Sequence, residues 1–450
     1  MSEKILDDHT NGGNSSNSSI NLNNTRNSDS LNSENFKITG KNNDDFIPPK
    51  AIDTLPDIHR VSRPLRHVKY IPTKALVFYS IHHPPQFTYD IKLKPPGSNN
   101  IIVQVLRVGL NPVDLKIYNS YTTNMNSYTG LGREYYGTIS AIGSKVDSQI
   151  WSVGDEVFGT FFHPNLGTGT LQSSITIDLN KDVILKKPTN LNKNEAAGAL
   201  YCLGTAYSIL HGLEENQKIK PDSNILINGG LSSVAIFALQ LLKNYYKVTS
   251  KIVLICSGSA ELAIKKKFPE YVNDLIFINY QRNLKIYKPL QSMINDGEFI
   301  DYDATGKPIS IKFQQGKFNI ILDFVGGYSI IEHSNSLIAK GADYITTVGD
   351  YKANYKSDIY NAPDNPSANV RKVFSKALWN FSYSHFHFDP NAKYVKYYGN
   401  WPENCCELLR KGVVKTVIDR TYDWKDYAEA FKYLRSRHAH GKLILKLEKF

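Results

Sequence analysis

The sequence predicts an α/β protein in which a β-rich domain precedes a doubly wound parallel sheet, behind an N-terminal tail without stable structure. Short apolar segments separated by glycines follow residue 70. From residue 224 to residue 348 strand-length and helix-length segments alternate, which is typical of a parallel sheet covered by helices. The first 45 residues are rich in Asn and Ser and almost free of aromatics. Such a segment cannot bury enough apolar surface to offset its ordering entropy, so we predict disorder.

Length and composition limit the possible classes of protein. The chain has 450 residues, of which 41% are hydrophobic and 12% aromatic, so two domains with large cores are expected. Its four cysteines, Cys202, Cys256, Cys405 and Cys406, lack the spacing of a metal knuckle. We expect no disulfide framework, which suits a reducing compartment.

Membrane and targeting signals are few. No run of about 18 apolar residues predicts a spanning helix, the N-terminus lacks the apolar core of a signal peptide, and no lipidation motif is present. The formal net charge of +11 suits nucleic acid, an anionic membrane surface, or simply solubility. Because no nucleic-acid motif is present, we expect no nucleic-acid partner and retain the anionic membrane surface. The predicted location is cytoplasmic, or peripheral on the cytosolic side of a membrane.

A basic, proline-bearing stretch joins the tail to the first domain. Between residues 47 and 69 it carries Pro48, Pro49, Pro56 and Pro64 together with Arg60, Arg63, Arg66, His67 and Lys69. It is either a solvated linker or a basic arm that contacts lipid headgroups or an acidic partner. Each Lys or Arg near an anionic surface contributes about 1 kcal/mol, so this stretch alone predicts only transient binding. We assign residues 1–69 to the disordered tail and basic linker.

The two folded domains are delimited by their strand patterns. Strands at 74–80, 101–108, 140–143 and 155–158 place the first part of the β-rich domain at residues 70–203. Residues 204–384 form the second domain, with strands at 224–228, 252–256, 275–278, 318–322 and 344–348, and helices at 234–243 and about 260–268. Residues 385–450 carry helices and end in a strand at 442–447. We expect this last segment to return to the first domain and complete it.

These segments resemble the zinc-free, quinone-oxidoreductase branch of the medium-chain dehydrogenases/reductases. Seven motifs match in order between residues 74 and 450: 111–114 (NPVD) with the following LKI, 132–137 (GREYYG), 153–159 (VGDEVFG), 195–197 (EAA), 204–207 (GTAY), 323–327 (DFVGG) and 441–442 (GK). Any one motif is weak, but seven in the right order are specific. The resemblance implies a GroES-like β-rich domain and a Rossmann-type nucleotide-binding-like domain.

Within that branch the chain resembles the fungal Ast family. The matching segments are 62–67 (SRPLRH), 163–167 (HPNLG), 324–328 (FVGGY) and 424–427 (WKDY). This resemblance implies a role in targeting the plasma-membrane proton ATPase to the cell surface. It also implies a peripheral location on raft membranes of the Golgi and plasma membrane.

A metal site is not predicted. The resemblance places Asn111 where zinc alcohol dehydrogenases have a Cys and Arg133 where they have a His, and the structural four-cysteine lobe is missing. Catalytic zinc needs three protein ligands and one open position. A lone loop histidine such as His163 is better explained as structural. The same holds for His385 and His387, which lie on one face of a predicted strand.

The loop after the strand 224–228 bears on cofactor binding. It reads GGLSSVA over residues 229–235, whereas a dinucleotide loop uses glycines for a tight turn and for close approach to the pyrophosphate. Gly229 and Gly230 are present, but Ser232, Ser233 and Ala235 stand where the family usually has glycine. Serine is unfavourable if the backbone needs a positive φ, yet it caps helices well and its hydroxyl can donate to a phosphate. The loop therefore predicts weakened NADPH binding.

The other cofactor candidates rest on the resemblance. Strand 252–256 is followed by Ser257 and not by an acidic residue, which favours NADPH over NAD, although Glu261 would repel the 2′-phosphate. Tyr280 matches a tyrosine that lies against the adenosine end, or is an ordinary strand-end aromatic. Asn111 and Thr205 match positions that line the nicotinamide pocket. The candidate set, conditional on NADPH binding, is Asn111, Thr205, Gly229, Gly230, Ser232, Ser233, Ser257, Tyr280 and Gly349.

Catalytic residues are harder to nominate. In zinc-free reductases the nicotinamide itself carries out the chemistry and the protein orients it. Tyr135 is the one nearby candidate acid in the GREYYG motif. It is a weak candidate, because tyrosine is common in cores and this chain has 28 of them.

An insertion at about 350–384 separates the last predicted strand of the second domain from the returning segment. It is polar and contains prolines, so it is either a lid over the cleft or a partner-binding surface. Residues 381–388 (FSYSHFHF) follow as an aromatic-rich strand. An exposed strand needs covering or pairing, and relatives pair a strand in this region across a dimer, so we predict a homo-oligomer.

Three functional hypotheses remain. The first is a membrane-associated, non-catalytic factor that assists targeting of the proton ATPase, which the family resemblance, the glycine losses and the basic arm favour. The second is an NADPH-dependent quinone or enoyl oxidoreductase. The third is a scaffold that senses NADPH without turnover. Since one fold hosts many functions, the fold cannot choose among them, and we favour the first.

Overall fold

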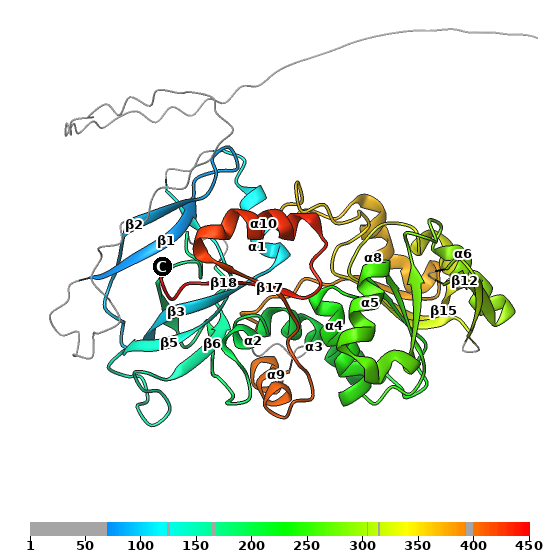
Figure 1. Cartoon of the computed structure of the whole chain (residues 1–450), viewed down its shortest axis with the longest axis horizontal. Coiled ribbons are helices and arrows are strands. Elements are labelled where there is room, and N and C mark those ends of the chain that lie inside the picture. Colours follow the sequence, from blue (N-terminus) through cyan, green and yellow to red (C-terminus); the bar gives the residue numbers. More distant parts are fainter. Residues whose placement is uncertain (1–69, 124–126, 164–166, 304, 314–315, 393–398) are drawn as a thin grey trace, which may run out of the picture. The chain divides into compact units, whose positions relative to one another are not determined.

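A computed structural model describes residues 70–123, 127–163, 167–303, 305–313, 316–392 and 399–450, coloured along the sequence in Figure 1. These residues belong to one compact unit. The predicted disordered tail and basic linker, residues 1–69, lie outside the described residues. No helix within the described ranges is long and apolar enough to cross a bilayer.

The β-rich part is built on a seven-stranded sheet. Its order is β17-β18-β3-β5-β6-β8, and β7 also pairs with β3. The strands are β3 (Asn100–Leu110), β5 (Glu134–Ile142), β6 (Glu156–Thr160), β7 (Ser174–Asp178), β8 (Val183–Lys186), β17 (Ile418–Asp423) and β18 (Lys442–Lys446). Strand β18 runs antiparallel to β3 with Leu443 opposite Leu110. The last strand of the chain therefore lies in the sheet that the first part began, as Figure 1 shows.

Smaller elements complete this part. A second sheet contains β2 (Gln86–Leu93), β1 (Ile71–Phe78) and β4 (Thr129–Gly130). The helices are α1 (Pro112–Ser120), α2 (Lys193–Ala197) and α10 (Tyr427–Ser436). Helix α1 begins at an Asn111 cap with Pro112 in its first turn, which suits a residue that lacks a backbone N–H.

The second part is a six-stranded parallel sheet of order β11-β10-β9-β14-β15-β16. Its strands are β9 (Ile225–Asn228), β10 (Ile252–Cys256), β11 (Leu275–Asn279), β14 (Phe318–Asp323), β15 (Ile338–Thr346) and β16 (Ser382–His385). Strands β9, β10 and β11 are apolar and buried throughout, apart from a terminal Asn or Cys, because helices cover both faces. The predicted α/β fold class is confirmed.

Helices cover the two faces of this sheet in separate cores. Ile225 and Ile227 share a core with α3 (Leu200–Glu215), α4 (Ser233–Gln240), α5 (Gly258–Lys267) and α9 (Trp401–Arg410). Leu226 faces the other core, with α6 (Tyr287–Asp296), α7 (Ser334–Leu337) and α8 (Pro366–Leu378). This alternation follows from the two-residue period of a strand. The strand order reverses between β9 and β14, where doubly wound sheets bind their ligands.

Several elements differ from the sequence-based prediction. The helix predicted at 234–243 is α4 followed by a π-turn at Leu241–Tyr245. Strand β15 begins six residues before the predicted Tyr344, because Lys340, Gly341 and Asp343 hide its first half in the sequence pattern. A hairpin of β12 (Glu298–Tyr302) and β13 (Pro308–Lys312) was not predicted. Neither was α8, because its Asn365-Pro366 start reads equally well as a polar turn.

Candidate functional site

The carboxyl ends of β9 and β14 are joined by the Asp323 side chain. Its Oδ1 accepts hydrogen bonds from Asn228 Nδ2 (2.9 Å) and from the N–H groups of Val325 (3.0 Å) and Gly326 (2.9 Å). Its Oδ2 accepts from the Tyr344 hydroxyl at 2.6 Å. Burial raises the pKa of Asp323. The carboxyl group thus shapes the loop at residues 324–328 and does not project toward a ligand.

The loop after β9 keeps its tight turn. Gly229 has φ +91°, and a Cβ there would lie 2.8 Å from Val325 Cγ2, so only glycine fits. Ser232 has φ −62° and its Oγ accepts the Ala235 N–H at 3.2 Å, capping α4. Ser233 is the first residue of α4. Neither serine needs a positive φ, so the backbone penalty considered for them does not arise.

The end of β10 is also arranged as a capped helix start. Ser257 Oγ accepts the Ala260 N–H at 3.2 Å and lies 3.1 Å from Ser259 Oγ. Ser259 Oγ in turn lies 3.4 Å from His440 Nε2. His440 comes from the returning segment, so sequence reasoning about the second domain could not have found it.

Glu261 is less repulsive to a phosphate than the sequence suggested. Its carboxylate lies 2.6 Å from Lys265 Nζ and 3.7 Å from Arg282. The sequence analysis did not identify Arg282 as a neighbour of Glu261. The available signal was a basic residue two positions after Tyr280. Tyr280 itself is 47% exposed, and its N–H donates to the Cys256 carbonyl at 3.1 Å.

Gly349 lies in the turn after β15. It has φ +91°, and a Cβ there would lie 3.2 Å from the His385 ring. Its N–H donates to Thr346 Oγ1 at 3.0 Å. The turn therefore requires glycine for its own packing, whether or not a cofactor binds.

At the expected nicotinamide end, Asn111 belongs to a buried cluster with Glu134, Cys202 and Lys442, which we call the ion cluster. Asn111 Oδ1 accepts from Lys442 Nζ (2.6 Å) and Cys202 Sγ (3.3 Å), and its Nδ2 donates to Glu134 Oε2 (3.1 Å). Lys442 Nζ lies 2.9 Å from Glu134 Oε2, with side chains 1% and 0% exposed. Within the ion cluster, both polar ends of the Asn111 side chain are engaged.

Electrostatics favour a stable ion pair in this cluster. Burial acts to lower the pKa of Lys442, but Cys202 and Glu134 offset this, and the net result is a raised pKa. Burial raises the pKa of Cys202 to about 11, so a neutral thiol adjoins the ammonium group at neutral pH. Glu134 and Lys442 both lie in motifs that carry the family resemblance, but the sequence alone assigned neither of them a role. Their signal was a charged residue at the first position of a strand, Glu134 in β5 and Lys442 in β18.

At Arg133, where zinc alcohol dehydrogenases have a histidine ligand, the side chain forms hydrogen bonds with backbone carbonyls. The buried Arg133 guanidinium donates to the carbonyls of Gly132 (2.6 Å), Thr168 (3.0 Å) and Gly130 (3.2 Å). Across the described ranges, no group of three or more His, Cys, Asp or Glu side chains is arranged to hold a metal ion.

The three histidines weighed as metal ligands have other neighbours. His163 Nε2 lies 2.5 Å from Asp182 Oδ1, and His385 Nδ1 lies 2.5 Å from Asp364 Oδ1. The rings of His385 and His387 pack with centroids 4.0 Å apart. These contacts agree with structural roles.

Two further candidates point into the protein. The Thr205 hydroxyl donates to the Tyr201 carbonyl within α3 at 2.7 Å. Tyr135 is 0% exposed, its hydroxyl donates to the Val183 carbonyl at 3.3 Å, and burial raises its pKa well above the usual value. This environment disfavours Tyr135 as a proton donor to a substrate.

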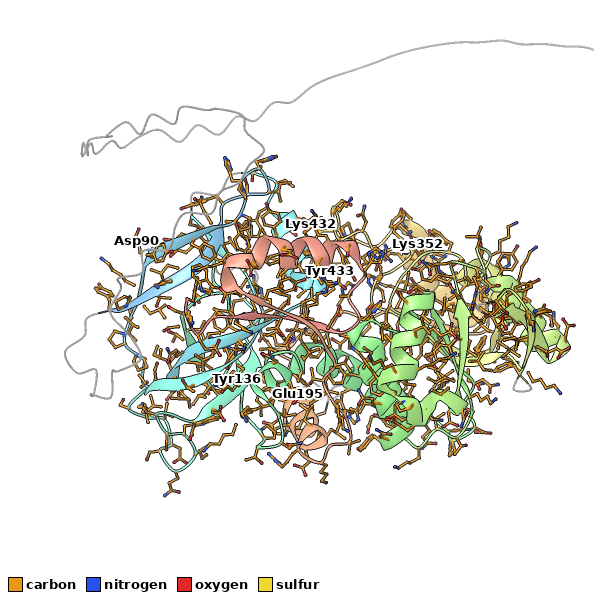
Figure 2. The ribbon with its side chains drawn as sticks, viewed as in Figure 1. Asp90, Tyr136, Glu195, Lys352, Lys432 and Tyr433 are labelled. Atoms are coloured by element: carbon orange, nitrogen blue, oxygen red, sulfur yellow. The ribbon has the colours of Figure 1, made fainter. Side chains whose placement is uncertain are left out.

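Residues 350–361, the first part of the insertion, form what we call the strap. At its start the Ala353 N–H donates to the Val325 carbonyl at 3.0 Å, and a Cβ on Gly326 would lie 2.2 Å from the Tyr351 carbonyl oxygen. The Arg437 guanidinium donates to the Ala353 carbonyl at 2.5 Å. This end of the strap therefore packs directly on the loop that Asp323 shapes. Lys352, labelled in Figure 2, lies here, and a Cβ on Gly327 would approach its Cγ to 3.0 Å.

The other end of the strap binds α1. Asn119 Nδ2 donates to the carbonyls of Tyr355 (3.3 Å) and Asp358 (2.9 Å). The Tyr360 N–H lies 3.0 Å from the Lys116 carbonyl and 2.9 Å from Ser120 Oγ. The strap thus connects the loop beside the parallel sheet to the helix that begins at Asn111.

The residues fit one end of NADPH better than the other. The Gly229 turn and the capped starts of α4 and α5 have the geometry that phosphates and an adenosine require. At the nicotinamide end, the polar groups of Asn111 and Thr205 are used internally and the strap crosses from one part to the other.

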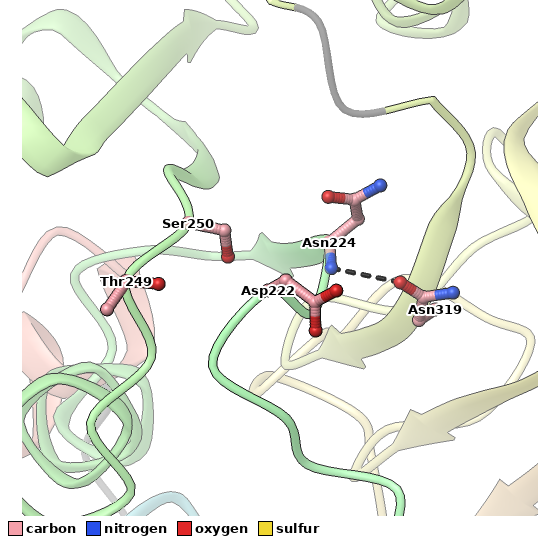
Figure 3. Close-up of a pocket in the computed structure, with 5 residues that line it drawn as sticks. All are labelled: Asp222, Asn224, Thr249, Ser250 and Asn319. Carbon is pink, nitrogen blue, oxygen red and sulfur yellow. Dashed lines mark hydrogen bonds between the residues drawn. The ribbon is translucent and has the colours of Figure 1, made fainter.

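A polar, open hollow of about 440 Å³ lies elsewhere. Its lining residues are Asp222, Asn224, Thr249, Ser250 and Asn319 (Figure 3). The Asn224 N–H donates to Asn319 Oδ1 at 3.0 Å. These residues precede or begin β9, β10 and β14, so the hollow is at the amino ends of the strands, opposite the cofactor loop.

Comparisons with known proteins agree with this architecture. Residues 97–188 match the profile "Alcohol dehydrogenase GroES-like domain", and residues 297–445 match "Zinc-binding dehydrogenase". Among solved structures, the quinone oxidoreductase from Coxiella burnetii has a TM-score of 0.59 at 17% identity, covering 84% of this chain and 100% of its own. The CurK enoyl reductase has a TM-score of 0.60 at 20% identity, covering 84% and 99%. At such identities the similarity establishes the fold alone.

Two relatives from Saccharomyces cerevisiae are much more similar. Protein AST1 is 48% identical over 406 residues, covering 89% of this chain and 94% of AST1. Protein AST2 is 50% identical over 400 residues, covering 88% and 93%. Protein YIM1 is 27% identical over 367 residues, covering 78% and 90%. The two domain matches place the chain among the medium-chain dehydrogenases/reductases, and within them it belongs to the family of AST1 and AST2.

Proposed function

We propose that the chain is a membrane-associated, non-catalytic factor on a quinone-reductase scaffold, which assists targeting of the plasma-membrane proton ATPase to the cell surface. The membrane and cargo parts of this proposal rest on the Ast-family resemblance set out above. The non-catalytic part rests on the geometry of the cleft.

The observation that carries the non-catalytic part is the strap. Hydride transfer requires a nicotinamide and a substrate to meet in a fixed geometry. Here the strap bonds to the loop at 324–328 and to α1. Asn111, Thr205 and Tyr135 direct their polar groups to internal partners.

The phosphate-binding end supports a second candidate, an NADPH-dependent quinone or enoyl oxidoreductase. Gly229, Gly230, Ser232 and Ser257 would hold the phosphates and ribose, and the cofactor would supply a hydride. This candidate requires the strap to leave the cleft, because the nicotinamide end lies on the α1 side.

Turnover separates the two candidates. NADPH oxidation is measured with quinones and enones for the full chain and for Asn119→Ala/Arg437→Gly, which removes three strap hydrogen bonds; glycine tolerates the φ of +62° at Arg437. We expect no turnover by the wild type above the background without protein. Turnover by the wild type would establish the oxidoreductase and overturn the non-catalytic proposal.

The cargo part needs a cellular readout. Host cells depleted of the chain are expected to show a lower surface fraction of the proton ATPase, measured by surface labelling. Re-expression of the wild type should restore it. Normal surface delivery in depleted cells would contradict the targeting role.

A further inference from the structure

Helix α8 presents an apolar surface to solvent. Val373 is 71% exposed, Leu378 62%, Phe374 50% and Val370 45%. Single exposed apolar residues are common on protein surfaces, but a contiguous group on one element marks an interaction site.

These four residues form one stripe. They lie at positions i, i+3, i+4 and i+8, which share one side of a helix with 3.6 residues per turn. The buried residues of α8 are Ala368, Arg371 and Ser375, at the i, i+3 and i+7 spacing of a different side. The helix therefore has two faces with separate tasks: one packs on the protein, and the other is the apolar stripe (Val370, Val373, Phe374 and Leu378).

The packed face holds α8 firmly, so the stripe is not a consequence of a loose helix. Arg371 forms an ion pair with Asp350, and its guanidinium lies over the rings of Tyr328 and Tyr383 at 5.6 and 5.3 Å. Ser375 Oγ accepts the Tyr383 N–H at 3.0 Å. That N–H belongs to β16, the outermost strand of the parallel sheet.

The charged residues that α8 itself carries next to the stripe are positive. Lys372 and Lys376 are exposed on the side of α8 between its buried face and the apolar stripe, and Lys372 also forms an ion pair with Asp364. Residues 366–378 contain no Asp or Glu. A helix with an apolar face, flanking lysines and no acidic residue has the chemistry of an interfacial helix that lies on an anionic bilayer.

We propose that α8 docks on an anionic membrane surface, with the apolar stripe inserted at the headgroup boundary and Lys372 and Lys376 facing the phosphates. At 13 residues the helix is about 20 Å long, enough to lie in the plane of the interface but not to cross it. The inference rests on the proposed function, because it names the surface by which the chain would associate with membranes.

An anionic bilayer fits better than a second copy of the chain. To pair two copies through β16, the backbone N–H groups on its unpaired edge would have to donate to the second copy. The Tyr383 N–H already donates to Ser375 Oγ. Stripe-to-stripe packing in a dimer would also bring the lysines of two helices together, which is unfavourable.

The test is flotation of the full chain with vesicles of phosphatidylcholine alone or with about a third phosphatidylserine. The stripe variant is Val373→Ser/Phe374→Ser/Leu378→Ser. The matched control is Leu262→Ser/Leu284→Ser, which removes apolar side chains that are 70% and 87% exposed elsewhere. We expect the wild type and the control to bind the anionic vesicles. The stripe variant should bind them at least about tenfold more weakly than the wild type.

The other outcomes are distinguishable. If the wild type and the stripe variant float equally well, α8 is not the docking surface, although membrane association stands. If the wild type binds neither vesicle, both the inference and the membrane part of the proposed function fail. If vesicle binding is equal but the stripe variant loses mass in light scattering, the occupant is a second copy and the inference is overturned. Equal thermal unfolding of the variants, which change exposed groups only, excludes loss of fold as the cause.

Discussion

At the residue scale, the ion cluster shows how charge is accommodated in the core. Lys442 and Glu134 are almost completely buried and lie 2.9 Å apart. A buried ion pair adds little net stability, but removal of one partner leaves an uncompensated charge and costs about 3–5 kcal/mol. The cluster is therefore an internal brace between β18 and β5.

Lys442→Met is expected to reduce the free energy of unfolding by about 3–5 kcal/mol, because the buried Glu134 side chain loses its ion-pair partner. Glu134→Gln/Lys442→Met should recover much of the loss. Denaturation in urea measures both. Lys411→Met, which removes an ammonium that is 65% exposed, serves as the control, and an equal effect of the two lysine substitutions would refute the brace.

Asp114 gives the protein a pH dependence with a definite sign. Burial raises its pKa to about 6 from 3.8. Above pH 6 the folded state bears the cost of a buried carboxylate. As the pH falls through 6 the folded state takes up the proton first, so the contribution of this group to stability rises until about pH 4.

Asp114→Asn should therefore be more stable than the wild type at pH 7.5, by at most about 3 kcal/mol in the free energy of unfolding. It should unfold at a correspondingly higher temperature. The difference should shrink at pH 5, where Asp114 is itself neutral in the folded state. Thermal unfolding at several pH values measures this, with the exposed Asp222→Asn as control. A difference that grows toward pH 5 would contradict the assignment.

Restoring glycines in the cofactor loop should not restore a cofactor site. Ser232 caps α4 at a negative φ and Ala235 is fully buried. Glycine inside a helix costs about 1 kcal/mol, so Ser232→Gly/Ser233→Gly/Ala235→Gly should lose stability without gaining NADPH affinity. Denaturation and calorimetry measure the two effects. Micromolar binding by this variant alone would show that the glycine losses, and not the strap, close the site.

At the element scale, the sequence alone could not decide between two roles for the insertion that contains the strap. The polar composition of 350–384 indicated a lid or a partner surface. In the structure, residues 350–361 bond to the loop at 324–328 and to α1, and α8 presents the apolar stripe. The signal for α8 was available in the cap residue Asn365 and the spacing of Val370, Val373, Phe374 and Leu378.

The strap should open locally without unfolding of the protein. Asn119→Ala removes the two hydrogen bonds to the carbonyls of Tyr355 and Asp358, each with a net contribution of about 1 kcal/mol. Amide exchange in residues 350–361 should accelerate about tenfold or more, while that of β9 and β14 stays unchanged. Equal acceleration in the central strands would instead indicate a general loss of stability.

At the scale of the whole molecule, most of the fold could be predicted from patterns that are local in sequence. Periodicity located the parallel strands because they are short, apolar and bounded by turns. Contacts between distant segments could not be found in this way: Lys442 with Glu134, Arg437 with Ala353, and His440 with Ser259. In each pair one partner comes from the returning segment, and its position depends on the tertiary fold.

The same long-range contacts separate the two ends of the candidate site. Glycine and serine geometry at the ends of β9 and β10 follows from local sequence and keeps the features of a nucleotide site. The nicotinamide end depends on α1, the strap and β18. The polar groups of these elements form hydrogen bonds with each other. We propose that this second end is closed in the native protein.

Titration calorimetry with NADPH tests that claim most directly. The full-length wild type and Asn119→Ala/Arg437→Gly are titrated under the same conditions. The closed cleft predicts no measurable heat for the wild type and binding by the variant, whose strap is released. Micromolar or tighter binding by the wild type, about −8 kcal/mol, would show that this end of the site is open and would contradict the proposal.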